Sequence, residues 1–155
     1  MTNQAPINIL LVDDDEDDLY FTHRALEKSN LPNNTYMVHD GIELMDYLNH
    51  QGKYTSETAP RPDLILLDLN MPKMNGTEAL KELRSHKNLA HIPVILFTTS
   101  SAEQDINMSY KLGANSYIKK PGDFNKLVEI MTALKTYWIE NASLPPKNWH
   151  PASTS

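Results

Sequence analysis

The stretch Ile7–Phe21, INILLVDDDEDDLYF, joins an apolar run directly to six consecutive acids. Ile7–Val12 is apolar at every position except Asn8, which predicts a strand buried on both faces of a sheet. Neighbouring like charges repel by about 1 kcal/mol per pair in water and by about 4 at an effective dielectric of 20. The acidic run is therefore a solvated helix start, a calcium loop or one wall of a cation site.

Four further short apolar runs follow along the chain, each bounded by turn residues or acids. They are Thr35–Val38, Leu64–Leu67, Val94–Phe97 and Ser116–Ile118. Segments with the apolar period of an amphipathic helix separate these runs, and one more follows the last of them. Apolar strands that alternate with helices are typical of a parallel sheet covered on both faces. The sequence thus predicts an α/β domain, a doubly wound five-stranded parallel sheet with five helices.

The composition limits the classes of protein to which the chain can belong. Its 155 residues, 40% hydrophobic and 22% charged, suit one soluble domain with a full core. No apolar run approaches the ~20 residues of a membrane span, and the first residues do not resemble a secretory signal. The absence of cysteine excludes disulfides and thiolate chemistry and fits a cytoplasmic location. A net charge of −6 without a basic cluster argues against nucleic-acid binding, so we expect neither nucleic acid nor membrane as a partner.

The residues that directly follow the predicted strands carry the candidate chemistry. They are Asp13 and Asp14, Asp68, Thr98 and Thr99, and Lys119 and Lys120. In doubly wound folds, ligands bind outside the carboxyl ends of the strands, so these side chains should converge. Three carboxylates in one place need a cation, and oxygen ligation by few carboxylates suits Mg²⁺. The loop after Asp68 contains Pro72 and Gly76, which can turn the backbone back over this site.

An aspartate that lies beside a cation and a lysine suggests phosphoryl transfer. A carboxylate can act as the nucleophile towards a phosphoryl donor, and positive charge then stabilises the phosphoryl oxygens. Asp68 is the candidate nucleophile, Lys120 the candidate phosphate partner, and Thr98 a candidate hydrogen-bond donor. We prefer Thr98 to Thr99 because it directly follows the last apolar residue of its strand.

The acidic run divides by function. A calcium loop fails on spacing, because Asp18 stands at the required glycine position and Arg24 at the closing glutamate position. Asp15 is the expected helix N-cap, with Asp18 in the first turn. Asp13 and Asp14 remain as the cation ligands. The other acids are expected to be mostly solvated: Glu16, Asp17 and Asp18.

Four ordered motifs resemble the receiver domain of two-component response regulators. They are ILLVDDD (9–15), DLILLDLNMPKMNG (63–76), IPVILFTTS (92–100) and GANSYIKKP (113–121). The resemblance covers about Ile7 to Trp138 and implies a flavodoxin-like, CheY-like fold with strand order 2-1-3-4-5. We place the receiver domain at 1–141 and an irregular C-terminal tail at 142–155.

The resemblance also implies a ligand set for Mg²⁺. Asp14 is a direct ligand, and Asp13 acts partly through water. The main-chain carbonyl of Asn70 is the third protein ligand besides these acids. Asp68 is the phosphoacceptor and shares the site with the metal.

Further roles follow from the same resemblance. Lys120, directly before a proline, pairs with the phosphate, whereas Lys119 faces solvent. Thr98 is the switch hydroxyl, and Tyr117 is the switch aromatic that turns inward as Thr98 moves. The positions that tune hydrolysis are Asn70 and Ser100, and the Lys120–Pro121 peptide bond is expected to be cis.

The implied function is that of a single-domain response regulator in a phosphorelay. Such a protein accepts a phosphoryl group from a sensor histidine kinase and signals by conformational switching. It is no enzyme beyond Mg-dependent self-phosphorylation and slow autodephosphorylation. The long Gly52–Pro62 insertion and the YWIENASLPP segment (137–146) resemble regulators paired with phytochrome-type kinases. Homodimerisation through the fourth helix, fifth strand and fifth helix is a further hypothesis.

Two other functions remain as alternatives. A haloacid-dehalogenase-type phosphatase also uses an aspartyl nucleophile after a strand, but it needs a second aspartate where this chain has Asn70. An amide cannot transfer the proton. A phosphorylation-independent adaptor would use only the receiver fold, although such members usually lack a key residue and this chain lacks none.

Overall fold

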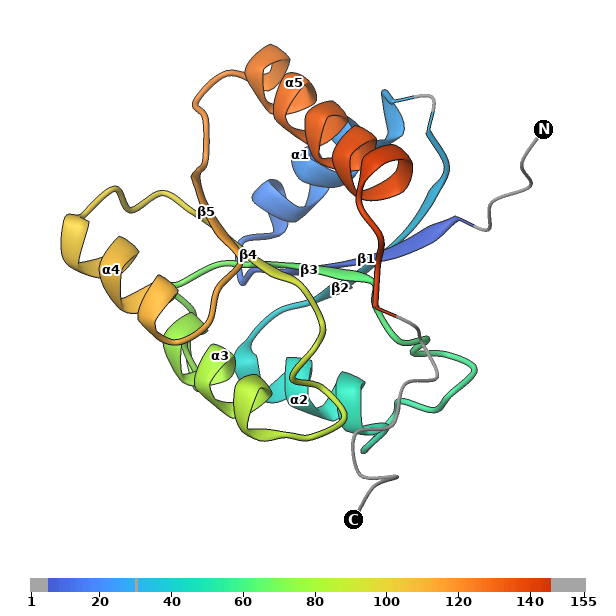
Figure 1. The fold of residues 1–155 in the computed structure, drawn as a ribbon, viewed down its shortest axis with the longest axis vertical. Helices are drawn as coiled ribbons and strands as arrows, with labels where there is room; N and C mark the ends of the chain where they lie inside the picture. Colours follow the sequence, from blue (N-terminus) through green and yellow to red (C-terminus); the bar gives the residue numbers. More distant parts are fainter. Residues whose placement is uncertain (1–5, 30, 146–155) are drawn as a thin grey trace.

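The computed structural model describes residues 6–29 and 31–145 of the chain. Within them, five parallel strands form one sheet in the order β2-β1-β3-β4-β5 (Figure 1). The strands are β1 (Ile7–Val12), β2 (Asn33–Val38), β3 (Leu64–Leu67), β4 (Val94–Thr98) and β5 (Ser116–Lys119). The helices are α1 (Glu16–Glu27), α2 (Gly41–Asn49), α3 (Gly76–Ser85), α4 (Glu103–Lys111) and α5 (Phe124–Lys135). The predicted fold, with its strand order and five helices, is confirmed.

Helices cover both faces of the sheet. Figure 1 shows α1 and α5 on one face and α2, α3 and α4 on the other. Successive residues of a strand point to opposite faces, so Leu10 and Val12 join the core under α2 and α3. Ile9 and Leu11 join the core under α1 and α5. Every residue of β1 is buried as a result, which explains its nearly continuous apolar sequence.

The acidic run changes from strand to helix at Asp15. The Asp15 carboxylate accepts hydrogen bonds from the backbone N–H groups of Asp17 and Asp18 at 2.9 and 3.2 Å. These bonds satisfy donors that the first turn of a helix leaves free, and acids there also favour the helix dipole. The predicted N-cap is confirmed, and it begins α1 directly after the two acids that follow β1.

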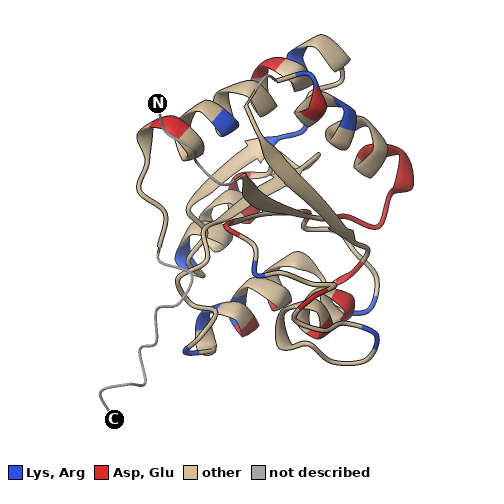
Figure 2. Ribbon diagram, turned by 90° about the vertical axis from the view of Figure 1, so that its right-hand side faces the viewer, with Lys and Arg blue, Asp and Glu red and all other residues tan. Residues whose placement is uncertain are grey.

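Charged side chains are mixed over the helices that surround the sheet. Figure 2 shows Lys and Arg positions interspersed with Asp and Glu positions on these helices.

No helix among the described residues combines the length and apolar character needed to cross a membrane.

The 52–62 insertion packs more closely than its polar sequence suggests. Ala59 is only 1% exposed, and the Tyr54 ring lies 5.2 Å from that of Tyr47 in α2. The Tyr54 hydroxyl donates a hydrogen bond to Glu43, and the Tyr47 hydroxyl donates one to the Pro60 carbonyl at 2.9 Å. The loop is therefore anchored to α2 by two tyrosines.

The peptide bond before Pro121 differs from the expectation. The Lys120–Pro121 peptide bond is trans, because the described residues contain no cis bond; the prediction of a cis bond is wrong. The trans form is the one that bonds to proline generally favour, by about 0.5–1 kcal/mol.

A π-helical segment, η1 (Thr136–Asn141), continues α5, and residues 142–145 have no regular structure. The rest of the predicted tail, 146–155, lies outside the described residues.

Candidate functional site

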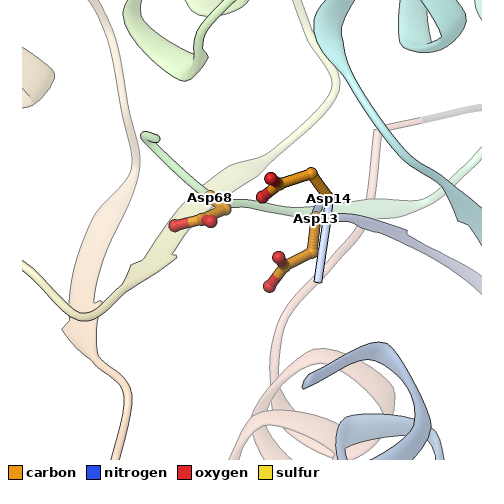
Figure 3. Close-up of side chains that lie close together, drawn as sticks. All are labelled: Asp13, Asp14 and Asp68. Atoms are coloured by element: carbon orange, nitrogen blue, oxygen red, sulfur yellow. The ribbon is translucent and has the colours of Figure 1, made fainter. Parts of the chain in front are cut away.

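Three carboxylates meet at the carboxyl ends of two neighbouring strands. Asp13 and Asp14 follow β1, Asp68 follows β3, and the register pairs Val12 with Leu67 just before them. Each carboxylate offers an oxygen within 4.8 Å of the others, and Figure 3 shows all three side chains directed past the strand ends. Asp13 and Asp68 are buried, whereas Asp14 is exposed. Sheet topology thus brings together residues that lie more than fifty positions apart in the chain.

Lys120 enters the same site from the end of β5. Its ammonium Nζ lies 2.5 Å from Asp13 Oδ2, 2.8 Å from Asp18 Oδ2 and 3.7 Å from Asp68 Oδ2. The lysine side chain is 10% exposed, so these contacts are largely shielded from solvent. One ammonium faces several carboxylates, and the site therefore retains excess negative charge.

Burial controls the ionisation of this site. Loss of solvent raises the pKa of Asp13 to about 6, although the hydrogen bonds from Lys120 and from the Asp15 N–H oppose that rise. Burial alone would lower the pKa of Lys120, but its hydrogen bonds to Asp13 and Asp18 outweigh burial, and the pKa is raised. Lys120 therefore remains charged, while the hydrogen bonds to Asp13 offset only part of the effect of burial on that carboxylate. An all-oxygen donor set with unbalanced negative charge fits a hard divalent cation.

Thr98 ends β4 with its side chain fully buried. Its hydroxyl has no hydrogen-bond partner among the described residues, whereas the neighbouring Thr99 is exposed. A buried hydroxyl without a partner typically costs about 1–3 kcal/mol. Of Thr98 and Thr99, Thr98 is thus the one directed into the protein. Its hydroxyl is a hydrogen-bond donor without an acceptor among the described residues, and it lies at the end of β4, the strand next to β3.

Tyr117 and Ser100 contact each other close to the end of β4. The Tyr117 hydroxyl donates a hydrogen bond to the Ser100 carbonyl at 2.9 Å, and the Tyr117 side chain is half-buried. The Ser100 hydroxyl donates to Asp105 at 2.6 Å. These two hydrogen bonds therefore link the loop after β4 to β5 and to α4.

Two glycines allow the loop after Asp68 to approach its neighbours. A Cβ atom on Gly76 would lie 2.3 Å from the Asp68 carbonyl oxygen, and the Gly76 N–H donates to the Leu69 carbonyl at 2.8 Å. A Cβ on Gly41 would lie 2.5 Å from the Met74 carbonyl oxygen, which accepts the Gly41 N–H at 3.0 Å. The loop is therefore held back over the strand end, as its proline and glycine predict.

The structure brings together Asp13, Asp14, Asp68 and Lys120, as the sequence predicts, and leaves Lys119 exposed. The Asn70 side chain is exposed, and the role of its main-chain carbonyl stays a prediction.

Asp18 was expected to be mostly solvated, which is wrong, because its carboxylate contacts Lys120. The available signal was helical spacing: Asp18 directly precedes buried Leu19 and lies four residues before buried Thr22 on the inner side of α1.

Comparison with known proteins agrees with this architecture. Residues 9–132 match the family model of the response regulator receiver domain. The response regulator Rcp1 of Synechocystis sp. is 38% identical over 92% of this chain and 96% of its own length. The chain also resembles the crystal structure of the phosphorylated cyanobacterial phytochrome response regulator RcpA, with 42% identity, a TM-score of 0.84, and coverage of 92% of this chain and 100% of RcpA. The Mn²⁺-bound form of Rcp1 gives 38% identity and a TM-score of 0.82 over 91% of this chain and all of the Rcp1 chain. Sheet order, the acids at the strand ends and these relatives lead to one assignment: the chain belongs to the response regulator receiver domain family.

Proposed function

We propose that Asp68 accepts a phosphoryl group from the phosphohistidine of a sensor histidine kinase and that the chain signals through the resulting change of shape. The observation that carries this proposal is the position of Asp68, a buried carboxylate at a strand end, 3.7 Å from the Lys120 ammonium and beside two further acids. The similarity to RcpA, a relative described in phosphorylated form, supports it.

The transfer step uses groups that this chain supplies. An Asp68 carboxylate oxygen attacks phosphorus, the P–N bond of the phosphohistidine breaks, and the imidazole nitrogen leaves with the electron pair and takes up a proton. The Lys120 ammonium then pairs with the phosphoryl oxygens, and the buried Thr98 hydroxyl donates to one of them. The product is an acyl phosphate on the chain itself, so the protein is a phosphorylated signal carrier and not a turnover enzyme.

The proposed cofactor is Mg²⁺. The carboxylates of Asp13, Asp14 and Asp68 would hold it, together with the main-chain carbonyl of Asn70. When bound, the ion supplies positive charge that offsets the charge of the phosphoryl oxygens. The Mn²⁺-bound form of the relative Rcp1 supports a divalent cation at such a site.

Cation binding is expected to weaken below about pH 6. Burial raises the pKa of Asp13 to about 6, so this carboxylate is ionised above that pH and protonated below it. A protonated carboxyl is a poor ligand, and the apparent Kd for Mg²⁺ should therefore rise by up to about tenfold for each pH unit below the pKa. Calorimetric titrations at pH 5, 6 and 7 measure this dependence. An unchanged Kd between pH 5 and 7 would show that Asp13 does not ligate the ion, and Asp13→Asn should flatten the profile.

Switching is proposed to pass from the site to the α4, β5 and α5 surface. Phosphorylation draws Thr98 and Lys120 towards Asp68, and Tyr117 turns inward as its bond to the Ser100 carbonyl changes. Only the difference in phosphoryl contacts between the two states can drive this shift. Asn70 and Ser100, each two residues beyond a site residue, are proposed to tune hydrolysis.

The proposed partner is a sensor histidine kinase in the cytoplasm, and the proposed class of kinase is the phytochrome type. The similarity to RcpA, a phytochrome response regulator, supports the kinase class. A second copy of the chain is a further proposed partner through α4, β5 and α5, where Met108 and Tyr110 of α4 are 47% and 49% exposed. The proposed domain is 1–141, followed by an irregular tail to residue 155.

Treatment with acetyl phosphate tests the proposed function. In the presence of Mg²⁺, the chain should gain the mass of one phosphoryl group, and removal of the cation with EDTA should prevent this gain. No uptake by folded protein would favour the phosphorylation-independent adaptor. Sustained turnover of p-nitrophenyl phosphate would instead favour the dehalogenase-type phosphatase.

A further inference from the structure

The Lys120 ammonium donates its hydrogen bonds to carboxylates other than the acceptor. Its nitrogen is within hydrogen-bond distance of Asp13 and Asp18, at 2.5 and 2.8 Å, but 3.7 Å from Asp68. The lysine that pairs with the phosphoryl group in the proposed function is thus held beside Asp68 without a hydrogen bond to it.

Asp18 differs from Asp13 in its relation to the cation site. Asp13 belongs to the group of three carboxylates that can hold a metal ion, and Asp18 does not. Asp18 is therefore the partner of Lys120 that a cation leaves available. Its side chain is 39% exposed, so solvent weakens the pair without removing it.

The packing of α1 fixes the position of Asp18. The Asp15 cap begins the helix, Leu19 and Thr22 are both buried, and Leu19 packs in the core between the sheet and α5. Asp18 therefore projects from the first turn towards the loop after β5. There it lines a hollow of about 400 Å³ together with Phe21, Lys120 and Pro121.

We propose that Asp18 is a positioning residue that keeps the Lys120 ammonium out of hydrogen-bond distance of Asp68 until a phosphoryl group is present. This inference rests on the proposed function of Asp68. When Lys120 moves to the phosphoryl group, its bond to Asp18 must weaken, so Asp18 raises the free energy of the phosphorylated state relative to the free state. Removing its charge should make that state more accessible.

Beryllofluoride, which mimics the phosphoryl group on a carboxylate, measures this competition at equilibrium. At saturating Mg²⁺, Asp18→Asn should bind beryllofluoride about two- to fivefold more tightly than the unaltered chain, since a partly exposed ion pair contributes up to about a fivefold factor. Asp18→Glu should restore the original affinity. Calorimetric titration gives both values.

Asp17→Asn is the matched control. Asp17 lies in the same helical turn and is exposed, and its substitution removes the same charge near the helix N-terminus. Its affinity should change less than twofold. Thermal unfolding of each variant checks the fold, and Asp18→Ser serves as a second variant if Asp18→Asn does not fold.

A readout of the lysine separates positioning from a general charge effect. The side-chain ¹⁵Nζ resonance of Lys120 in the cation-free protein should shift in Asp18→Asn and remain in place in Asp17→Asn. Equal beryllofluoride affinities for the two variants, or weaker binding by Asp18→Asn, would overturn the role of Asp18. Failure of the unaltered chain to bind beryllofluoride would instead count against the proposed function itself.

Discussion

Asp68→Asn is expected to abolish phosphoryl uptake from acetyl phosphate while the protein stays folded. The amide lacks the nucleophilic oxygen that forms the acyl phosphate. Its carbonyl oxygen can still accept the Leu69 N–H bond, which measures 2.9 Å to Asp68 Oδ1 in the structure. Removing one of three crowded acids should also reduce repulsion, so the melting temperature should be unchanged or higher. Intact-protein mass spectrometry and thermal unfolding give the two readouts.

The control for this substitution is Asp17→Asn, an exposed acid near the site that takes no part in the carboxylate group. It should label as fully as the unaltered chain. Persistent labelling of Asp68→Asn would mean that another carboxylate, such as Asp13 or Asp14, accepts the phosphoryl group.

Gly76→Ala is expected to destabilise the fold by about 3 kcal/mol or more, because the new methyl group has no space. Its Cβ would lie 2.3 Å from the Asp68 carbonyl oxygen and 2.8 Å from the Leu69 Cα. Both neighbours are backbone atoms, so relief requires movement of the loop that follows the acceptor. The folded fraction should therefore also label poorly. Urea unfolding monitored by circular dichroism measures the stability.

Gly122→Ala is the matched control, because no atom lies within 4 Å of the position that its Cβ would occupy. Its stability should change by no more than about 0.5 kcal/mol. Equal stabilities for the two variants would show that the loop yields readily at Gly76, against the close approach described above.

The fold could be predicted because the three central strands, β1, β3 and β4, are buried on both sides and each leads into residues of distinct chemistry. Ile7–Val12 is one example, since burial on both faces removes the alternation that a half-exposed strand would show. The boundary of one strand differs from the prediction: β2 begins at Asn33, two residues before the predicted Thr35, where polar residues pair with β1 at the edge of the sheet. The packing of Tyr54 on Tyr47 also depends on a tertiary contact that the polar loop sequence does not reveal.

The candidate site was predictable in its members but not in its pairing. The sheet order alone brings the acids after β1 beside Asp68, because β1 and β3 are neighbours. Whether Asp18 also reaches Lys120 depends on the rotation of α1 about its axis, which the residues at the strand ends do not determine. The sequence therefore predicts a solvated acid at Asp18, although Asp18 lies 2.8 Å from the lysine ammonium.

Chemical trapping of the phosphoryl group tests the central claim most directly. Borohydride reduces an aspartyl phosphate to homoserine, which marks the modified position permanently. The chain should be incubated with acetyl phosphate and Mg²⁺, reduced with borohydride, digested and sequenced by tandem mass spectrometry. Homoserine is expected at position 68 and at no other aspartate. Homoserine at Asp13 or Asp14, or its absence from every peptide of a fully covered digest, would contradict the assignment.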